Sequence, residues 1–146
     1  MKIVKTMNKL DFTLLNDGSM SVYLALLNVG YKTDIYSRVQ LIIDTGASRT
    51  LISAATILDL GYQRLATATY SKVNTFAEPI ICHHYEIPSF RLAGDLLVKK
   101  PTVWVPDGSQ CVDNVLGQDI LKEYNYYIDN DDCCIYFEPK LIINLF

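Results

Sequence analysis

The chain has few cysteines and no long apolar run. Its 146 residues include four cysteines, too few and too unevenly placed for a disulfide framework, and we interpret them as reduced thiols that pack rather than react. They are Cys82, Cys111, Cys133 and Cys134. Neither the N-terminus nor any later stretch is apolar for long enough to be a signal peptide or to cross a membrane. We therefore expect a protein without a membrane span that stays in the cytoplasm.

Positive charge is not in excess. The chain has 13 Lys and Arg residues against 16 Asp and Glu residues, a net charge of −3, and the two signs are interspersed, so no basic field attracts a phosphate backbone. The tyrosine-rich stretch 123–129 lacks nearby basic residues. This favours core or interface packing over an aromatic platform for single-stranded nucleic acid. We expect no nucleic-acid partner.

The composition is that of one globular domain. Hydrophobic residues make up 50% of the chain and charged residues 20%, which excludes a largely disordered chain. No internal repeat, low-complexity tract or linker rich in Pro, Gly or Ser interrupts it. We expect residues 1–146 to form a single domain.

Short β-branched and aromatic runs alternate with turn-forming sequences, which predicts a mostly β fold, either a sandwich or a barrel. The expected strands are 21–29, 36–44, 81–87, 96–105, 133–139 and 141–146. Two segments favour helix instead. Residues 53–61 have Ser53 as a candidate N-cap and Gly61 as a C-terminal stop, and residues 116–125 have Asp119 in the first turn.

Asp44 interrupts the apolar run LIIDTGASRTLI at residues 41–52. Burying an ionised carboxylate costs several kcal/mol or more unless charge or hydrogen bonds compensate. One interpretation is structural: Asp44 and Thr45 bond to the backbone of a polar turn, and Gly46 takes a positive φ. The other is that the carboxylate performs chemistry. The twelve residues alone leave both open.

Two separate motifs are similar to those of one protein family. Residues 41–52 resemble the active-site loop of the retropepsins, the retroviral and retrotransposon aspartic proteases and their cellular relatives, in which an apolar run precedes Asp-Thr-Gly-Ala and then Ser or Asp. Residues 112–129 resemble the family's second signature, where Val115, Leu116 and Gly117 lead into a helix and then a strand. The resemblance spans about residues 21–139. It implies a mostly β, retropepsin-like closed-barrel acid protease fold with one short helix in the C-terminal half and a single lobe per chain.

The resemblance also implies an activity, that of an aspartic endopeptidase. Such enzymes hydrolyse peptide bonds with a water held by two aspartates that share a proton. This sequence has one Asp-Thr-Gly and no Asp-Ser-Gly, so the second carboxylate would be Asp44 of another copy in a symmetric homodimer. No metal or organic cofactor is required. The substrate would be a peptide or protein bound in extended form.

The family's site residues carry over position by position. Asp44 would be acid in one subunit and base in the other, Thr45 would bond across the two-fold axis, and Gly46 would let the substrate approach the backbone. A flap at residues 67–87 would close over the substrate. The residues expected to bind substrate are Ala47, Ser48, Asn74, Thr75, Phe76, Ala77 and Leu116.

The sequence departs from the viral pattern in two places. Viral flaps have glycine at the tip, whereas this chain has no glycine between Gly61 and Gly94, and we expect a stiffer or differently closing flap. Viral enzymes often have Asp after the Ala and Arg after the helix Gly, where this chain has Ser48 and Gln118. Either a neutral hydrogen-bonded pair of these two residues or an Arg49–Asp119 ion pair would replace that support.

These departures leave alternatives open. The chain is either an active protease or a catalytically weak or inactive peptide-binding or assembly module with the same fold, and it is also compatible with a piece of a larger precursor. In viral retropepsins interleaved terminal strands form much of the dimer interface, so residues 1–12 and 140–146 are candidates for it. Pairing within the monomer's own sheet is an equal alternative.

A metal site is not expected. Cys82, His83 and His84 are consecutive, and consecutive residues of a strand point to opposite faces, so the three cannot converge on one ion. Their spacing, with Cys111 as a further ligand, fits no structural zinc pattern. We expect the two histidines to lie on a flap strand, one on each face.

Overall fold

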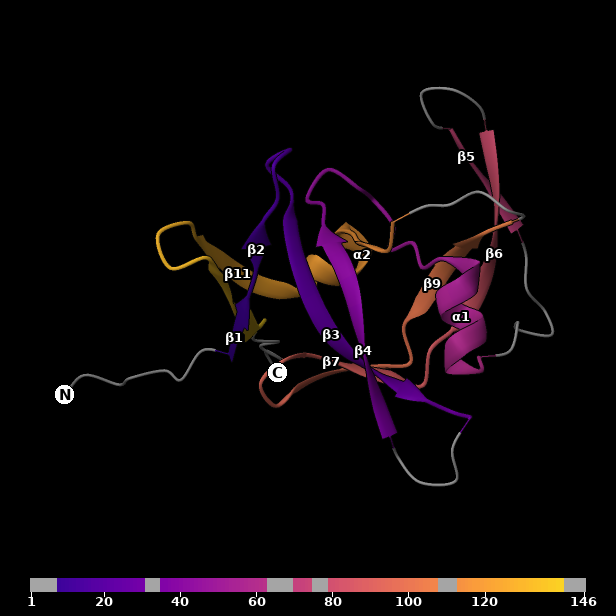
Figure 1. Cartoon of the computed structure of the whole chain (residues 1–146), viewed down its shortest axis with the longest axis horizontal. Coiled ribbons are helices and arrows are strands. Elements are labelled where there is room, and N and C mark those ends of the chain that lie inside the picture. The colour runs from indigo at the N-terminus through magenta and orange to yellow at the C-terminus, as the bar shows by residue number, and fades with distance from the viewer. Residues whose placement is uncertain (1–7, 31–34, 63–69, 75–78, 108–112, 141–146) are drawn as a thin grey trace, which may run out of the picture.

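The computed structural model describes residues 8–30, 35–62, 70–74, 79–107 and 113–140 (Figure 1). These residues form twelve strands and two short helices, which confirms the mostly β prediction. The strands are β1 (Asn8–Asp11), β2 (Thr13–Leu14), β3 (Met20–Asn28), β4 (Ile35–Ile43), β5 (Tyr70–Asn74), β6 (Pro79–Glu86), β7 (Ser89–Ala93), β8 (Leu96–Lys99), β9 (Thr102–Pro106), β10 (Val115–Leu116), β11 (Tyr124–Asp129) and β12 (Cys134–Pro139). The helices are α1 (Ala54–Leu60) and α2 (Gln118–Leu121).

The described strands fall into three sheets. The largest has the order β10-β4-β3-β7-β8, with β2 paired to β3, and the other two have the orders β1-β12-β11 and β5-β6-β9. The β10–β4 pair is parallel, and the other pairs are antiparallel. Figure 1 shows β1 and β11 at one end of the molecule and the β5–β6 hairpin at the other. Closure into a single barrel, which the family resemblance implied, is not confirmed among these strands.

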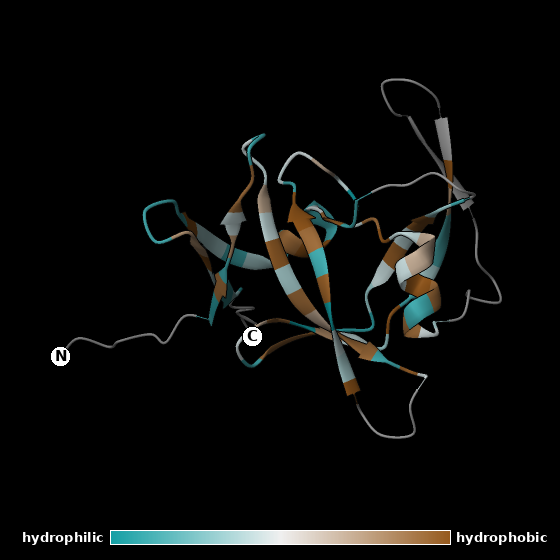
Figure 2. Ribbon diagram, viewed as in Figure 1, coloured by the Kyte–Doolittle hydropathy of each residue, from teal (hydrophilic) through white to brown (hydrophobic). Residues whose placement is uncertain are grey.

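The longest strands bury one face and expose the other. In β3 the side chains of Val22, Leu24 and Leu26 are buried, while Tyr23 between them is 46% exposed. This is the period-two alternation of a strand whose sheet has one face on the core. Figure 2 shows the same alternation of hydrophobic and hydrophilic residues along β3 and β4. The buried face anchors the central sheet in the core, and β4 of this sheet ends immediately before Asp44.

Helix α1 begins where the sequence predicted, whereas α2 begins at Gln118, two residues after the start of the expected segment. The Ser53 hydroxyl accepts a hydrogen bond from the Thr56 N–H at 3.2 Å, and Gly61 ends α1 with φ of 78°, which confirms the expected cap and stop. Helix α2 has only four residues, and β11 starts three residues after it, so the helical part of the expected segment 116–125 is shorter than predicted.

The structure divides one of the expected strands into two. The segment 96–105 divides into β8 and β9, because Lys100 has φ of 48° and donates its N–H to the Pro88 carbonyl at 3.1 Å. A non-glycine residue in this left-handed region ends an extended run. The antiparallel β7–β8 pairing continues in the same register into the β6–β9 pairing, so the chain bends at Lys100 without reversing, and β9 pairs with β6 of the β5–β6 hairpin.

Several predictions fall on residues that are not described. They include the flap tip Thr75–Ala77, the thiol Cys111, residues 1–7 and the expected strand 141–146. The roles of the two chain ends in a dimer interface remain predictions. Among the described residues, none of the helices is long and apolar enough to cross a membrane.

Candidate active site

Asp44 is exposed at the point where β4 ends. Its N–H donates to the Leu116 carbonyl at 3.1 Å, which continues the pairing of β4 with β10 by one residue. Its carboxylate Oδ1 accepts a hydrogen bond from the Gly46 N–H at 2.9 Å. The expected cost of burying this carboxylate does not arise in a single chain, because the strand delivers Asp44 to the surface.

The local turn differs from the expected one. The Ala47 N–H donates to the Asp44 carbonyl at 3.1 Å, so residues 44–47 form a tight turn. Gly46 is not among the residues with positive φ, which makes that part of the structural interpretation wrong. Glycine is suited to this position for another reason: a Cβ would lie 3.3 Å from Asp44 Oδ1 and would crowd the carboxylate.

The apolar residues on both sides of the turn anchor it. Leu41, Ile43 and Ile52 are buried at 5% exposure or less. Leu51 exchanges two backbone hydrogen bonds with Val115, at 2.8 and 2.9 Å, and also forms a bridge to Trp104 of β9. The loop is thus fixed to two sheets at once, which is the support that a preorganised site needs.

Gly117 lies where the two sequence motifs meet. A Cβ at this position would lie 2.6 Å from the backbone C and O of Arg49 and 2.9 Å from the Ala47 carbonyl. Next to it, the Gln118 N–H donates to the Ala47 carbonyl at 2.8 Å and the Asp119 N–H to the Ser48 carbonyl at 3.2 Å. Glycine is required because the Asp44 loop crosses the start of α2 at backbone contact distance.

The polar support of the loop comes from a pair that the sequence did not indicate. The carboxylate of Asp119 accepts hydrogen bonds from the Thr50 N–H at 3.0 Å and the Thr50 hydroxyl at 2.7 Å. The same hydroxyl accepts the Gly117 N–H at 3.1 Å. Thr50 is 1% exposed and Asp119 is partly buried, so this charge-assisted network extends from the core toward the surface. The signal for this network in the sequence was Thr50 itself, a polar residue six positions after Asp44 within an apolar stretch.

Neither pair expected from the sequence is formed. Among the described residues Arg49 and Asp119 make no ion pair, and the Arg49 guanidinium instead lies 5.2 Å from the centroid of the Trp104 ring. Gln118 does not bond the Ser48 side chain, because its amide donates to the Thr45 carbonyl at 3.0 Å. The Asp119 carboxylate instead accepts hydrogen bonds from Thr50 and from the Ile120 N–H.

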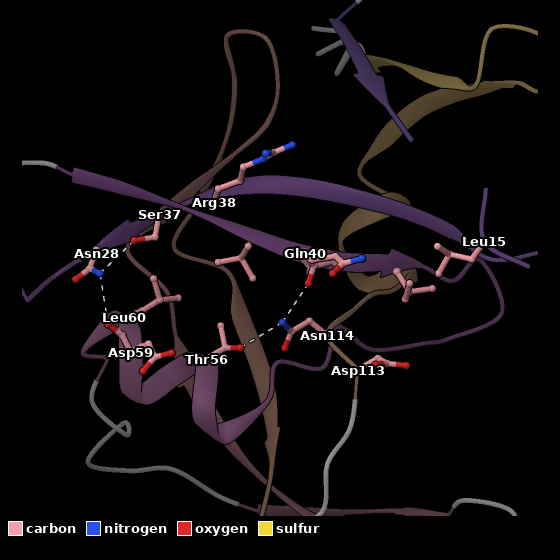
Figure 3. Close-up of a pocket in the computed structure, with 13 residues that line it drawn as sticks. Leu15, Asn28, Ser37, Arg38, Gln40, Thr56, Asp59, Leu60, Asp113 and Asn114 are labelled. Carbon is pink, nitrogen blue, oxygen red and sulfur yellow. Dashed lines mark hydrogen bonds between the residues drawn. The ribbon is translucent and has the colours of Figure 1, made fainter. Parts of the chain in front are cut away.

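Asn114 fixes the approach of β10 to β4. Its carbonyl accepts the Ile42 N–H at 2.8 Å, and its side chain donates to the Gln40 carbonyl at 3.1 Å and accepts the Ser53 N–H at 2.8 Å. These bonds border a polar hollow of about 570 Å³ between β4 and α1 (Figure 3). Asp44 does not line it, so this hollow is separate from the candidate carboxylate.

The remaining predicted residues are placed unevenly. Thr45 and Ser48 are exposed and Ala47 is partly buried, all on the Asp44 loop. Leu116 is fully buried, so its side chain packs in the core and only its carbonyl reaches the loop, which does not fit the prediction that it contacts substrate. Asn74 is the last residue of β5, and the rest of the expected flap tip lies outside the described residues.

The strands expected to carry the flap pair with each other and with β9. In the β5–β6 hairpin Tyr70 is opposite His83, and β6 in turn pairs with β9. His84 stacks on Trp104 with ring centroids 5.0 Å apart, whereas His83 Nε2 lies 3.6 Å from the Asp107 carboxylate. Within the described part of the chain no three His, Cys, Asp or Glu residues form a metal-binding group.

The fold is of the retropepsin-like type. The structure is similar to that of a retropepsin-like aspartic protease from Rickettsia conorii, with a TM-score of 0.63 and 18% sequence identity over 94% of this chain and 95% of that chain. The family model for aspartyl proteases matches residues 32–120. The chain therefore belongs to the aspartyl protease family, which confirms the resemblance found in the motifs. No curated protein matches the sequence.

Proposed function

We propose that this protein is an aspartic endopeptidase that works as a homodimer, with one Asp44 from each subunit. The observation that carries the proposal is the exposed Asp44 carboxylate, which accepts a hydrogen bond from the Gly46 N–H. Its loop is anchored by buried apolar residues on both sides and by backbone hydrogen bonds to the start of α2. Membership of the aspartyl protease family supports it. Exposure of residues 44–46 in a single chain is what a site completed by a second copy requires.

The reaction would follow from two carboxylates sharing one proton. The ionised Asp44 takes a proton from water as the water oxygen attacks the peptide carbonyl, and the protonated Asp44 of the other subunit donates a hydrogen bond to that carbonyl oxygen. A proton then passes to the leaving nitrogen as the carbon–nitrogen bond breaks.

The substrate would be an extended peptide with apolar residues on both sides of the scissile bond. An extended chain offers backbone groups to the loop and places alternate side chains in pockets. This preference is open to test with a peptide library. Cleavage confined to bonds beside charged residues would contradict it.

The decisive variant is Asp44→Asn, which keeps the shape of the side chain and removes its acid–base chemistry. We expect cleavage of a denatured protein between about pH 4 and 7 to fall by at least a thousandfold, since both carboxylates are lost from the dimer. Asp95→Asn is the matched control, because Asp95 is an exposed aspartate in the turn between β7 and β8, and it should cleave as wild type does. Equal activity of wild type and Asp44→Asn would refute the protease proposal. A dimeric wild type without cleavage would instead favour the peptide-binding module.

A further inference from the structure

The side-chain amide of Gln118 joins two parts of the molecule that are distant in sequence. Its Nε2 lies 3.0 Å from the Thr45 carbonyl oxygen and 3.2 Å from the Tyr126 hydroxyl. Gln118 is the first residue of α2, and Tyr126 lies on β11 in the sheet formed by β1, β12 and β11. The Asp44 loop is thereby connected to a second sheet through a single side chain.

The orientation of this amide follows from its partners. A backbone carbonyl only accepts hydrogen bonds, so the Gln118 group that faces Thr45 must be its NH₂. The NH₂ has two hydrogens, and the Thr45 carbonyl and the Tyr126 hydroxyl take one each. The Tyr126 ring is held in turn against Phe137, with centroids 6.2 Å apart. The Gln118 NH₂ group is thus held between the Thr45 carbonyl and the Tyr126 hydroxyl.

The Thr45 carbonyl belongs to the same peptide unit as the Gly46 N–H. In a trans peptide these two groups point in opposite directions from one rigid plane. The Gly46 N–H donates to Asp44 Oδ1 at 2.9 Å. A continuous line of hydrogen bonds therefore runs from the Tyr126 hydroxyl through Gln118 and the Thr45–Gly46 peptide to the carboxylate of Asp44.

We propose that Gln118 and Tyr126 are positioning residues that act on the Asp44 carboxylate through the Thr45–Gly46 peptide. This inference rests on the proposed protease function. Donation to the Thr45 carbonyl polarises the peptide and strengthens the Gly46 N–H as a donor. It also fixes the plane of the peptide, and with it the direction from which the N–H meets Oδ1.

The line is distinct from the Thr50–Asp119 network. Thr50 and Asp119 hold the backbone of the loop against α2, and among the described residues no hydrogen bond of that network reaches the Asp44 carboxylate. Gln118 acts on the one peptide unit that contacts this carboxylate. A purely structural role of Gln118 would alter stability without a selective effect on the turnover step.

The kinetic test compares kcat with KM. In Gln118→Met, which keeps the length and removes both donors, we expect kcat to fall about tenfold, the value of one lost hydrogen bond, while KM changes less than twofold. Tyr126→Phe should lower kcat about threefold by freeing the Gln118 amide. The double variant should match Gln118→Met alone, because the Tyr126 effect passes through Gln118. Tyr127→Phe, on the neighbouring exposed tyrosine, is the matched control and should leave kcat unchanged.

A spectroscopic test needs no activity. In uniformly ¹⁵N-labelled protein the Gly46 amide proton should move upfield in Gln118→Met and by a smaller amount in Tyr126→Phe, with no change in Tyr127→Phe, because a weaker donor is less deshielded. The mild Tyr126→Phe substitution keeps the test usable if Gln118→Met does not fold. An unmoved Gly46 resonance together with unchanged kcat in both variants would overturn the inference. Failure of the protease proposal appears separately, as equal cleavage by wild type and Asp44→Asn.

Discussion

Thr50 donates both its backbone N–H and its hydroxyl to the carboxylate of Asp119, at 3.0 and 2.7 Å. The two residues are 69 positions apart in the chain, and the pair joins the loop that carries Asp44 to the helix that follows the second motif. Because the Thr50 hydroxyl also accepts the Gly117 N–H at 3.1 Å, two polar groups, the Asp119 carboxylate and the Gly117 N–H, depend on one buried hydroxyl. This relationship leads to the first prediction.

Thr50→Val removes the hydroxyl with little change of shape. We expect the free energy of unfolding to fall by about 1–3 kcal/mol, since the Gly117 N–H loses its acceptor and Asp119 Oδ1 keeps only the Ile120 N–H. Urea unfolding followed by circular dichroism measures the change. Thr13→Val is the matched control, because Thr13 is exposed on β2, and it should alter stability by less than about 0.5 kcal/mol. Equal midpoints for Thr50→Val and wild type would show that the network does not stabilise the fold.

Gly117→Ala should damage both stability and cleavage. The added Cβ would lie 2.6 Å from backbone atoms of Arg49, and backbone cannot move aside as a flexible side chain can, so the Asp44 loop must shift. We expect a loss of about 1–3 kcal/mol in the free energy of unfolding and a fall in kcat/KM larger than the unfolded fraction explains. Gly30→Ala is the control, because its Cβ would meet only the Asn28 side chain, at 3.2 Å. A fully active Gly117→Ala enzyme would contradict the close crossing of the two motifs.

Tyr62 should make the protein sensitive to alkali. Burial, with a smaller contribution from Tyr36, raises the pKa of Tyr62 to about 12, and its hydroxyl donates to the Leu27 carbonyl. Between pH 10 and 12 the unfolded chain loses this proton while the folded chain keeps it, so stability that is complete below pH 10 is lost as the pH rises. We expect a loss of about 1–2 kcal/mol, less than the full value of the shift because solvent partly screens the hydroxyl.

The Tyr62 effect is isolated by comparison with Tyr62→Phe. Urea midpoints measured from pH 8 to 11.5 should fall more steeply for wild type than for Tyr62→Phe, because only wild type has this proton to lose. Tyr127→Phe, which removes the hydroxyl of a tyrosine that is 61% exposed, should follow wild type. Parallel curves for wild type and Tyr62→Phe would assign the alkaline loss to other groups.

A shared site predicts a dominant effect of the inactive subunit. When wild type and Asp44→Asn chains are unfolded together and refolded at equal amounts, random pairing leaves about a quarter of the dimers with two intact Asp44 residues. We expect activity near a quarter of that given by the same total amount of wild type. Independent catalytic monomers would give a half. The assay is cleavage of a quenched fluorescent peptide, with Asp95→Asn in place of Asp44→Asn as the control mixture, which should retain full activity.

The sequence alone determined the class of fold and the position of the motif. The β-branched and aromatic runs that became β3 and β4, the Ser53 cap and the Gly61 stop are local signals, readable because backbone conformation follows from near neighbours. The Asp-Thr-Gly-Ala turn and the Val115–Gly117 motif were identifiable for the same reason. Each is a short contiguous pattern with a backbone requirement of its own.

Only the tertiary structure decided what surrounds Asp44. The bonds between Thr50 and Asp119, and those from Gln118 to Thr45 and Tyr126, join residues that are 8 to 73 positions apart in the chain. No local propensity selects among such partners, and none sets the exposure of Asp44. Ser48 and Arg49 were reasonable candidates for polar support by spacing, yet the buried Thr50 took Asp119 instead. An unpaired polar group costs free energy when it is buried. The packing that buries Thr50 therefore requires hydrogen-bond partners for it, and the Asp119 carboxylate is one of them.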